Sequence, residues 1–180
     1  VAGNLSVDSG TIKLDGNYPT GTNNLAFGDT ALDSLDGSSP GGYNVVIGSL
    51  SGTAITTGAS NVGVGYASLL SNTTGGSNTS IGTEAFRSNT TASNNTAVGY
   101  QAGYNTTTGA QNTFLGRKAG RGVTTGTENT FVGNSAGRDG TVTGSYNIGL
   151  GSVPLNALTS GSYNIAIGRD ALGANTTASY

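Results

Sequence analysis

The chain of 180 residues contains no cysteine, histidine, methionine or tryptophan. Without cysteine no disulfide can form, and without cysteine and histidine the usual ligands of structural zinc are missing. The lack of histidine also excludes Ser-His-Asp catalysis, so the Gly-x-Ser-x-Gly sequences at 37–41 and 133–137 do not predict a hydrolase.

Charge and long apolar runs are also scarce. Only 9% of the residues are charged and the formal net charge is -2, with a sequence pI near 4.7. This balance disfavours nucleic-acid binding. No apolar run reaches the roughly 18 residues of a membrane-spanning helix, so membrane insertion is not predicted either.

In place of these residues the chain has 32 glycines and a five-residue phrase that returns at a fixed interval. The phrase is asparagine, two variable residues, a large apolar residue and glycine. Its nine copies begin at Asn24, Asn44, Asn61, Asn78, Asn95, Asn112, Asn129, Asn147 and Asn164. Successive asparagines are 17 residues apart, except for a first interval of 20 and a seventh of 18. A period this strict is typical of a repeat architecture.

Each repeat can be numbered from its asparagine as position 0. Position 3 is then always large and apolar, position 4 is always glycine, and position 12 is usually threonine. No apolar stripe with a 3.6-residue period is present, so helices are not predicted. The pattern is that of a short strand, a glycine bend and a polar corner. It predicts an all-β chain folded as a parallel β-solenoid of nine coils of about 17 residues, stacked about 4.8 Å apart.

Positions 1, 3 and 8 are predicted to fill the interior of the coil. The residues at position 3, which define the predicted structural core, are Phe27, Ile47, Val64, Ile81, Val98, Leu115, Val132, Leu150 and Ile167. The nine asparagines are predicted to form a structural ladder at one corner and the position-12 threonines a second ladder, because such side chains bond backbone groups that are unpaired at corners.

Two domains are predicted: residues 1–23, outside the period, and the nine-coil rod of residues 24–180. Alternating apolar and polar residues in the first segment predict two lead-in strands, a cap or a joint to a preceding segment. Three apolar positions per coil bury little surface, compared with the entropy lost when 17 residues are ordered. We therefore expect the rod to bury a further face against copies of itself, as an intertwined or side-by-side parallel homotrimer.

The repeat resembles two families of fibrous proteins. Residues 95–103, Asn-Thr-Ala-Val-Gly-Tyr-Gln-Ala-Gly, and residues 72–75, Asn-Thr-Thr-Gly, resemble the repeats of phage tail fibres, and this likeness spans about residues 24–180. The opening, residues 3–10, resembles the lead-in strands of such fibres. The phrase with isoleucine before glycine is also similar to the head repeats of YadA-type trimeric autotransporter adhesins, whose repeat is shorter.

The first resemblance implies a structural segment of a virion tail fibre, a shaft or host-contacting rod that positions or contributes to receptor binding on a bacterial surface. The second implies the head of an adhesin, or another filament, at the bacterial cell surface.

Arginine and tyrosine recur at two positions of the repeat and are the candidate binding residues. They are Arg87, Tyr104, Arg121 and Arg138 at position 9, and Tyr66, Tyr100, Arg117 and Arg169 at position 5. Arginine and aromatic side chains often carry recognition of carbohydrates and proteins. We expect contact with a bacterial surface polysaccharide or protein receptor; the alternative is that these side chains only cover the rod.

The sequence predicts no enzyme, metal or cofactor. The acids are scattered, and only Asp29, Asp33 and Asp36 cluster, which leaves them as the place to look for a glycosidase pair or a cation. Threonine files also occur in ice-binding solenoids, but adjacent residues such as Thr73 and Thr74 would point to opposite faces of a strand.

Overall fold

A computed structural model describes residues 23–35 and 41–179. The described part contains nine strands of three residues each and no helix. The strands are β1 (Leu25–Phe27), β2 (Val45–Ile47), β3 (Val62–Val64), β4 (Thr79–Ile81), β5 (Thr96–Val98), β6 (Thr113–Leu115), β7 (Thr130–Val132), β8 (Ile148–Leu150) and β9 (Ile165–Ile167). The lead-in strands predicted within 1–23 lie outside the described residues; of that segment the structure describes Asn23 alone.

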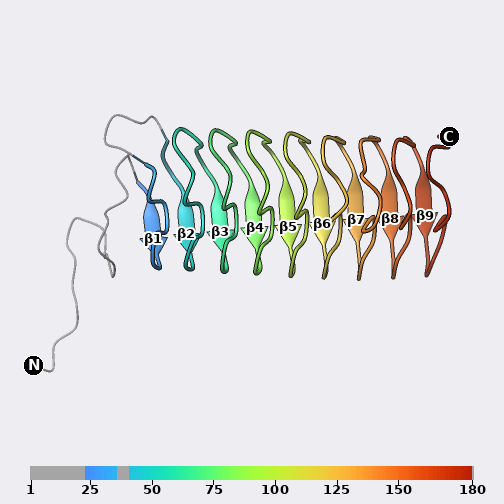
Figure 1. Ribbon diagram of the computed structural model, residues 1–180, viewed down its shortest axis with the longest axis horizontal. Coiled ribbons are helices and arrows are strands. Elements are labelled where there is room, and N and C mark those ends of the chain that lie inside the picture. The colour runs from blue at the N-terminus through green and yellow to red at the C-terminus, as the bar shows by residue number, and fades with distance from the viewer. Residues whose placement is uncertain (1–22, 36–40, 180) are drawn as a thin grey trace, which may run out of the picture.

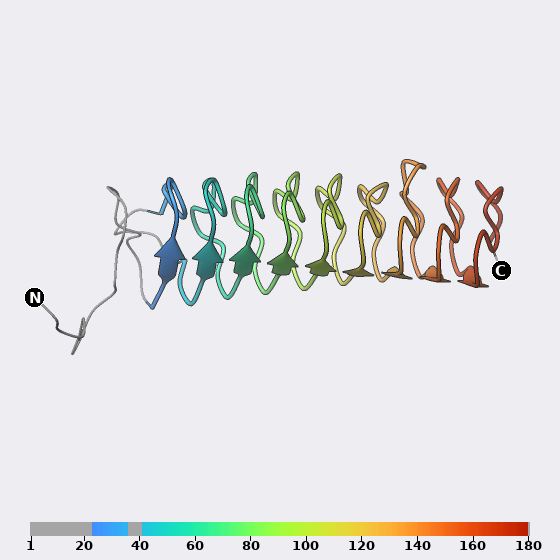
Figure 2. The ribbon, with the colours of Figure 1, turned by 90° about the horizontal axis from the view of Figure 1, so that it is seen from below.

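The strands form one parallel sheet in the order of the sequence. Equivalent residues pair in register, as in Thr96 with Thr113 and Val98 with Leu115. Each strand with the chain that follows it is one coil, so coil 1 starts at Asn24 and coil 9 at Asn164. The coils stack into an unbranched rod, and the strands form a single row along it (Figures 1 and 2). The predicted parallel β-solenoid is therefore confirmed.

The asparagine ladder is also confirmed. The backbone N–H of Asn61 donates to Oδ1 of Asn44 at 2.9 Å, and Nδ2 of Asn61 donates to the same oxygen at 3.1 Å. That Nδ2 also donates to the carbonyl of Gly75 at 2.9 Å, across the coil. The asparagines of all nine coils are buried. Each side chain thus bonds an amide and a carbonyl that the strands leave unpaired.

The threonines of the polar corner form the second ladder. The hydroxyl of Thr73 donates to the carbonyl of Thr90 at 3.1 Å, and that of Thr90 donates to the carbonyl of Thr107 at 3.2 Å. In coil 7 the extra residue shifts the chain: Val142 pairs with Val123 of coil 6, so Thr143 rather than Thr141 follows it at the corner.

The prediction that position 3 faces the coil interior is wrong. The middle residue of every strand is buried, whereas its neighbours at positions 1 and 3 are half-buried or exposed. Ile47 is 38% exposed and Ile167 is 69% exposed, but Val46 is fully buried. The correction covers the whole predicted set, Phe27, Ile47, Val64, Ile81, Val98, Leu115, Val132, Leu150 and Ile167. A three-residue strand directs only its middle side chain inward. Side chains alternate along the strand, so position 2 lies on the same side as the buried asparagine at position 0, and positions 1 and 3 lie outside.

The interior is formed instead by positions 2, 8 and 11, with small residues at position 7. Position 8 was predicted correctly: Leu69 and Phe86 are fully buried there. Large side chains at position 2 are matched by glycine at position 8. Phe114 of coil 6 lies against Gly120, where an added Cβ would be 2.2 Å from the ring. In coil 4 the large residue is Phe86 at position 8, and position 2 is the buried Ser80. The coils thus exchange volume between two positions while the interior stays filled.

Candidate binding surface

Two consecutive turns place positions 5 and 9 on the outside of each coil. In coil 5 the N–H of Ala102 donates to Gly99 at 3.2 Å, and the N–H of Thr106 donates to Gly103 at 3.0 Å. Tyr100 and Tyr104 are the second residues of these two turns. The chain between them reverses sharply because the backbone is left-handed at position 6, with φ 53° at Gln101, and at position 8, with φ 60° at Gly103. Both tyrosines retain exposed surface.

The candidate residues at position 9 form a continuous file over coils 4 to 7. The guanidinium carbon of Arg87 lies 5.7 Å from the centre of the Tyr104 ring, and that of Arg121 lies 5.5 Å from it. Arg87 also donates from Nη1 to the Tyr104 hydroxyl at 3.3 Å. One tyrosine is therefore contacted by arginines of the coils on either side, in cation–π geometry.

The candidate residues at position 5 come together only in part. Arg117 lies over Tyr100 of the preceding coil, 5.9 Å from the ring centre. Tyr66, which is 52% exposed, belongs to coil 3, and Arg169 belongs to coil 9, so both lie outside this pair. The eight candidates therefore do not form one site.

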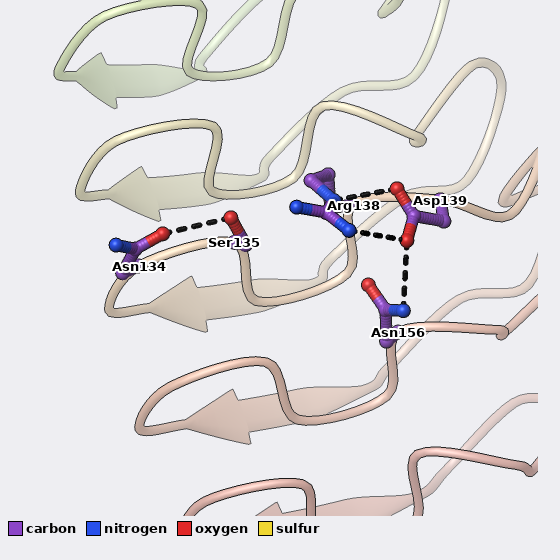
Figure 3. Close-up of polar contacts among 5 residues, drawn as sticks. All are labelled: Asn134, Ser135, Arg138, Asp139 and Asn156. Atoms are coloured by element: carbon purple, nitrogen blue, oxygen red, sulfur yellow. Dashed lines mark hydrogen bonds and ion pairs between the residues drawn. The ribbon is translucent and has the colours of Figure 1, made fainter.

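Three of the candidate arginines are neutralised by a nearby carboxylate. Arg87 lies 3.6 Å from Glu84, and Arg169 lies 3.6 Å from Asp170. Arg138 makes a bidentate contact with Asp139, and Asn156 of the next coil donates to that carboxylate at 2.8 Å (Figure 3). These arginines are less available to an external anion.

The cations of coil 6 differ from these. Among the described residues, no carboxylate lies within ion-pair distance of Arg117, Lys118 or Arg121. Nε of Arg121 is also buried without a hydrogen-bond partner in the described part of the chain. The sequence prediction missed Lys118 because no other coil has lysine at position 6; the signal that could have identified it was three cations within five residues.

The Arg138–Asp139 pair gives the rod a defined response to pH. Hydrogen bonds from Arg138, with a smaller contribution from Asn156, hold the pKa of Asp139 below its ordinary value, against the opposing effect of burial. The stability that this carboxylate contributes is present above its unfolded-state pKa of about 3.9 and is lost as pH falls through the lower folded-state pKa.

We expect Asp139→Asn to lower the melting temperature at neutral pH by at most about 2–4 °C, because both partners are partly exposed and such pairs contribute up to about 1 kcal/mol. The difference from the parent protein should narrow once pH is well below about 3.9. Circular dichroism melts across this range measure it. A difference that is constant with pH would contradict the assigned role of the pair.

A second surface is the outer sheet face, which consists of the side chains at positions 1 and 3 of β1–β9. Position 3 is apolar in all nine coils, position 1 is aliphatic or threonine, and neither position carries a charge. Several of these side chains are exposed in the single chain, among them Ile81, Leu115 and Ile165. With strands about 4.8 Å apart, the face extends roughly 40 Å along the rod. Continuous exposed apolar surface of this kind marks an interaction site.

Exposed tyrosines occur next to the outer sheet face in the sequence. Tyr146 and Tyr163 precede the asparagines of coils 8 and 9, and their rings stack with centres 4.8 Å apart. A hydrogen bond with Glu128 of the preceding coil raises the pKa of Tyr146. Equivalent side chains of successive coils therefore also contact each other outside the strands.

Comparison with known proteins finds no match to a family model, a curated protein or a solved structure. Within the described ranges, no group of three or more acidic residues is positioned to hold a metal ion, which includes the described Asp29 and Asp33 but not the undescribed Asp36. Those ranges also contain no helix with the length and hydrophobicity of a membrane span.

Proposed function

We propose that the chain is a structural segment of a phage tail fibre, in which three parallel copies form a rod that positions or contributes to receptor binding on a bacterial surface. The observation that carries the proposal is an unbranched solenoid whose outer sheet face is uncharged over its whole length and has an apolar side chain at position 3 of every coil. The sequence resemblance to tail-fibre repeats supports the same assignment. In this proposal the segment has a mechanical rather than a catalytic role and is part of the virion.

The outer sheet face is the proposed interface of the trimer. A copy of the same chain carries side chains at the same spacing of about 4.8 Å, so its coils meet equivalent coils at every level. A threefold axis parallel to the rod keeps this match along all nine coils and lets the fibre continue in one direction. The apolar side chains at position 3 then become buried in the assembly, which accounts for their size in every repeat.

Val98→Asp tests this interface. Val98 is a position-3 residue of β5 and is only half-buried in the single chain. We expect the parent protein to have a trimer mass, 3 × 17.7 = 53.1 kDa from the chain mass of 17.7 kDa. The variant should have the monomer mass with its β-structure retained, because three uncompensated charges at the axis disfavour association. Light scattering with chromatography and circular dichroism measure both properties.

The matched control is Thr108→Asp, which places the same charge on the exposed polar corner of the same coil. It should remain trimeric. A monomeric parent protein would refute the trimer, and a trimeric Val98→Asp variant would show that the outer sheet face is not the interface. If Val98→Asp lost its β-structure but kept the trimer mass, the result would indicate that position 3 faces the interior of the coil.

The location in the virion is tested separately. Antibodies against the rod should label fibres on phage particles in electron micrographs. Labelling confined to the surface of bacterial cells would instead support the second resemblance, to adhesin heads.

A further inference from the structure

We infer that coils 5 and 6 form a binding site for an acidic oligosaccharide. The site consists of Tyr100 and Tyr104 from coil 5 with Arg117, Lys118 and Arg121 from coil 6, and this set is called the basic patch below. The inference deepens the proposed function, on which it rests, by giving one part of the rod a ligand of defined chemistry.

Positive charge is unevenly distributed along the rod. The described residues include six cations, and the basic patch contains three of them in one coil. The remaining arginines each have a carboxylate partner within 4 Å, whereas the three in the patch have none among the described residues. In a chain with a net charge of -2, this is a local concentration of positive charge without ion-pair partners, and it attracts anions.

Nε of Arg121 is buried and has no hydrogen-bond acceptor among the described residues. A buried N–H without an acceptor is destabilising, so such groups in native proteins call for an explanation such as a ligand. The charge of Arg121 acts on Asp139, but that carboxylate is already bound by Arg138 and Asn156. Nε itself is covered, so an external anion would contact the terminal nitrogens of the same guanidinium, which are not enclosed.

The tyrosine rings of coil 5 lie next to these cations. Arg117 and Arg121 each lie over a tyrosine of coil 5, at 5.9 Å and 5.5 Å. Tyr100 is nevertheless 42% exposed, so part of its ring is available to the apolar face of a sugar. Charged groups for an acid and aromatic surface for a pyranose therefore occur in the same two coils.

The basic patch is short along the rod. Glu84 of coil 4 and Asp139 of coil 7 place carboxylates on the same two turns of the flanking coils. These coils are three steps apart, or about 14 Å. Because these carboxylates pair with Arg87 and Arg138, the flanking coils offer no unpaired positive charge at these turns, which disfavours a long uniform polyanion such as a nucleic acid. A short stretch with one or two acidic sugars fits between them.

Binding is tested on the assembled protein by calorimetry with four probes: a heparin tetrasaccharide, a hyaluronan tetrasaccharide, maltotetraose and inorganic tripolyphosphate. We expect at least one acidic tetrasaccharide to bind and its affinity to fall as salt is raised. Hyaluronan carries carboxylates alone, whereas heparin carries sulfates in addition, so the two probes show whether carboxylates are sufficient for binding. Maltotetraose should not bind measurably, and tripolyphosphate should bind more weakly than the acidic sugar.

The test variant is the triple substitution Arg117→Gln, Lys118→Gln and Arg121→Gln, which should weaken binding by about tenfold or more because it removes hydrogen bonds to charged groups. The matched control is Thr91→Glu, Thr108→Glu and Thr125→Glu, which makes the same change in net charge at three exposed corner residues. The control should bind within about twofold of the parent protein.

Three results would overturn the inference: no binding of either acidic tetrasaccharide, equal loss in the two triple variants, or tripolyphosphate binding as tightly as the sugars. The mass and circular dichroism of each sample are recorded alongside. A trimeric, folded protein without sugar binding would refute the site and leave the proposed rod intact, whereas a monomer that binds would refute the rod alone.

Discussion

Gly99→Ala is expected to lower the free energy of unfolding by about 2–6 kcal/mol, the sum of backbone strain and overpacking. Gly99 is the position-4 glycine of coil 5, and its φ of 132° lies in a region that residues with a Cβ rarely adopt. An added Cβ would lie 2.5 Å from the carbonyl oxygen of Gly116 in the next coil. That backbone cannot move aside, because the N–H of Gly116 is bonded to the carbonyl of Val98 at 2.8 Å. Urea unfolding followed by circular dichroism measures the loss.

The control for Gly99→Ala is Gly76→Ser, at position 15 of coil 3. The equivalent residue of coil 4 is Ser93, whose hydroxyl accepts a hydrogen bond from the N–H of Gly76 at 3.0 Å. A serine at 76 would repeat this arrangement one coil earlier, so we expect little change in stability or a small gain. If the two substitutions had similar effects, the position-4 glycines would not be needed for conformation and close approach.

Phe114→Ala is expected to cost about 3–5 kcal/mol of unfolding free energy, the usual range for removing a fully buried phenylalanine. The ring stacks on Phe131 with centres 5.9 Å apart and is tilted against Phe86 at the same distance. Its loss leaves a cavity between three coils that cannot close, because the backbone ladders on either side hold the coils at a fixed spacing.

A double-mutant cycle with Gly120→Ala checks the exchange of volume between positions 2 and 8. Gly120→Ala alone should destabilise the rod by about 1–3 kcal/mol because the new methyl would overlap the Phe114 ring. The left-handed backbone at this position is not the cause, since Leu69 adopts φ 53° at the equivalent place. In the Phe114→Ala background the methyl enters the cavity, so the double variant should lose less than the sum of the single ones. Strict additivity would contradict the proposed packing.

The period of 17 residues was sufficient to predict a parallel solenoid, the number of coils and their stacking. It succeeded because one residue type per position, such as the asparagine at 0, implies that every coil presents the same group to its neighbours. The asparagine ladder could be predicted for the same reason: a buried amide side chain must bond backbone groups, and in a solenoid those groups recur at the same corner.

The direction of the strand side chains could not be predicted correctly from the sequence. A three-residue strand alternates either way, and the invariant large residue at position 3 has the appearance of a core residue. The closed coil instead buries position 2, whether the residue there is small, as Ala97, or large, as Phe114, and leaves Val98 outside. This choice depends on how the coil closes, which no single repeat specifies.

The candidate binding residues also divide into features that the sequence determines and features that only the structure decides. By itself the sequence determined the repeat, the coil, the ladders and the coil in which each arginine and tyrosine stands, because these depend on spacing along the chain. Only the tertiary structure decided that Arg138 is bound by Asp139 and by Asn156 from the next coil, and that the cations of coil 6 have no such partners. It also decided which face of the sheet is outside. Both depend on distances between side chains and on the volume a coil encloses, and these exist only once the coils are closed and stacked.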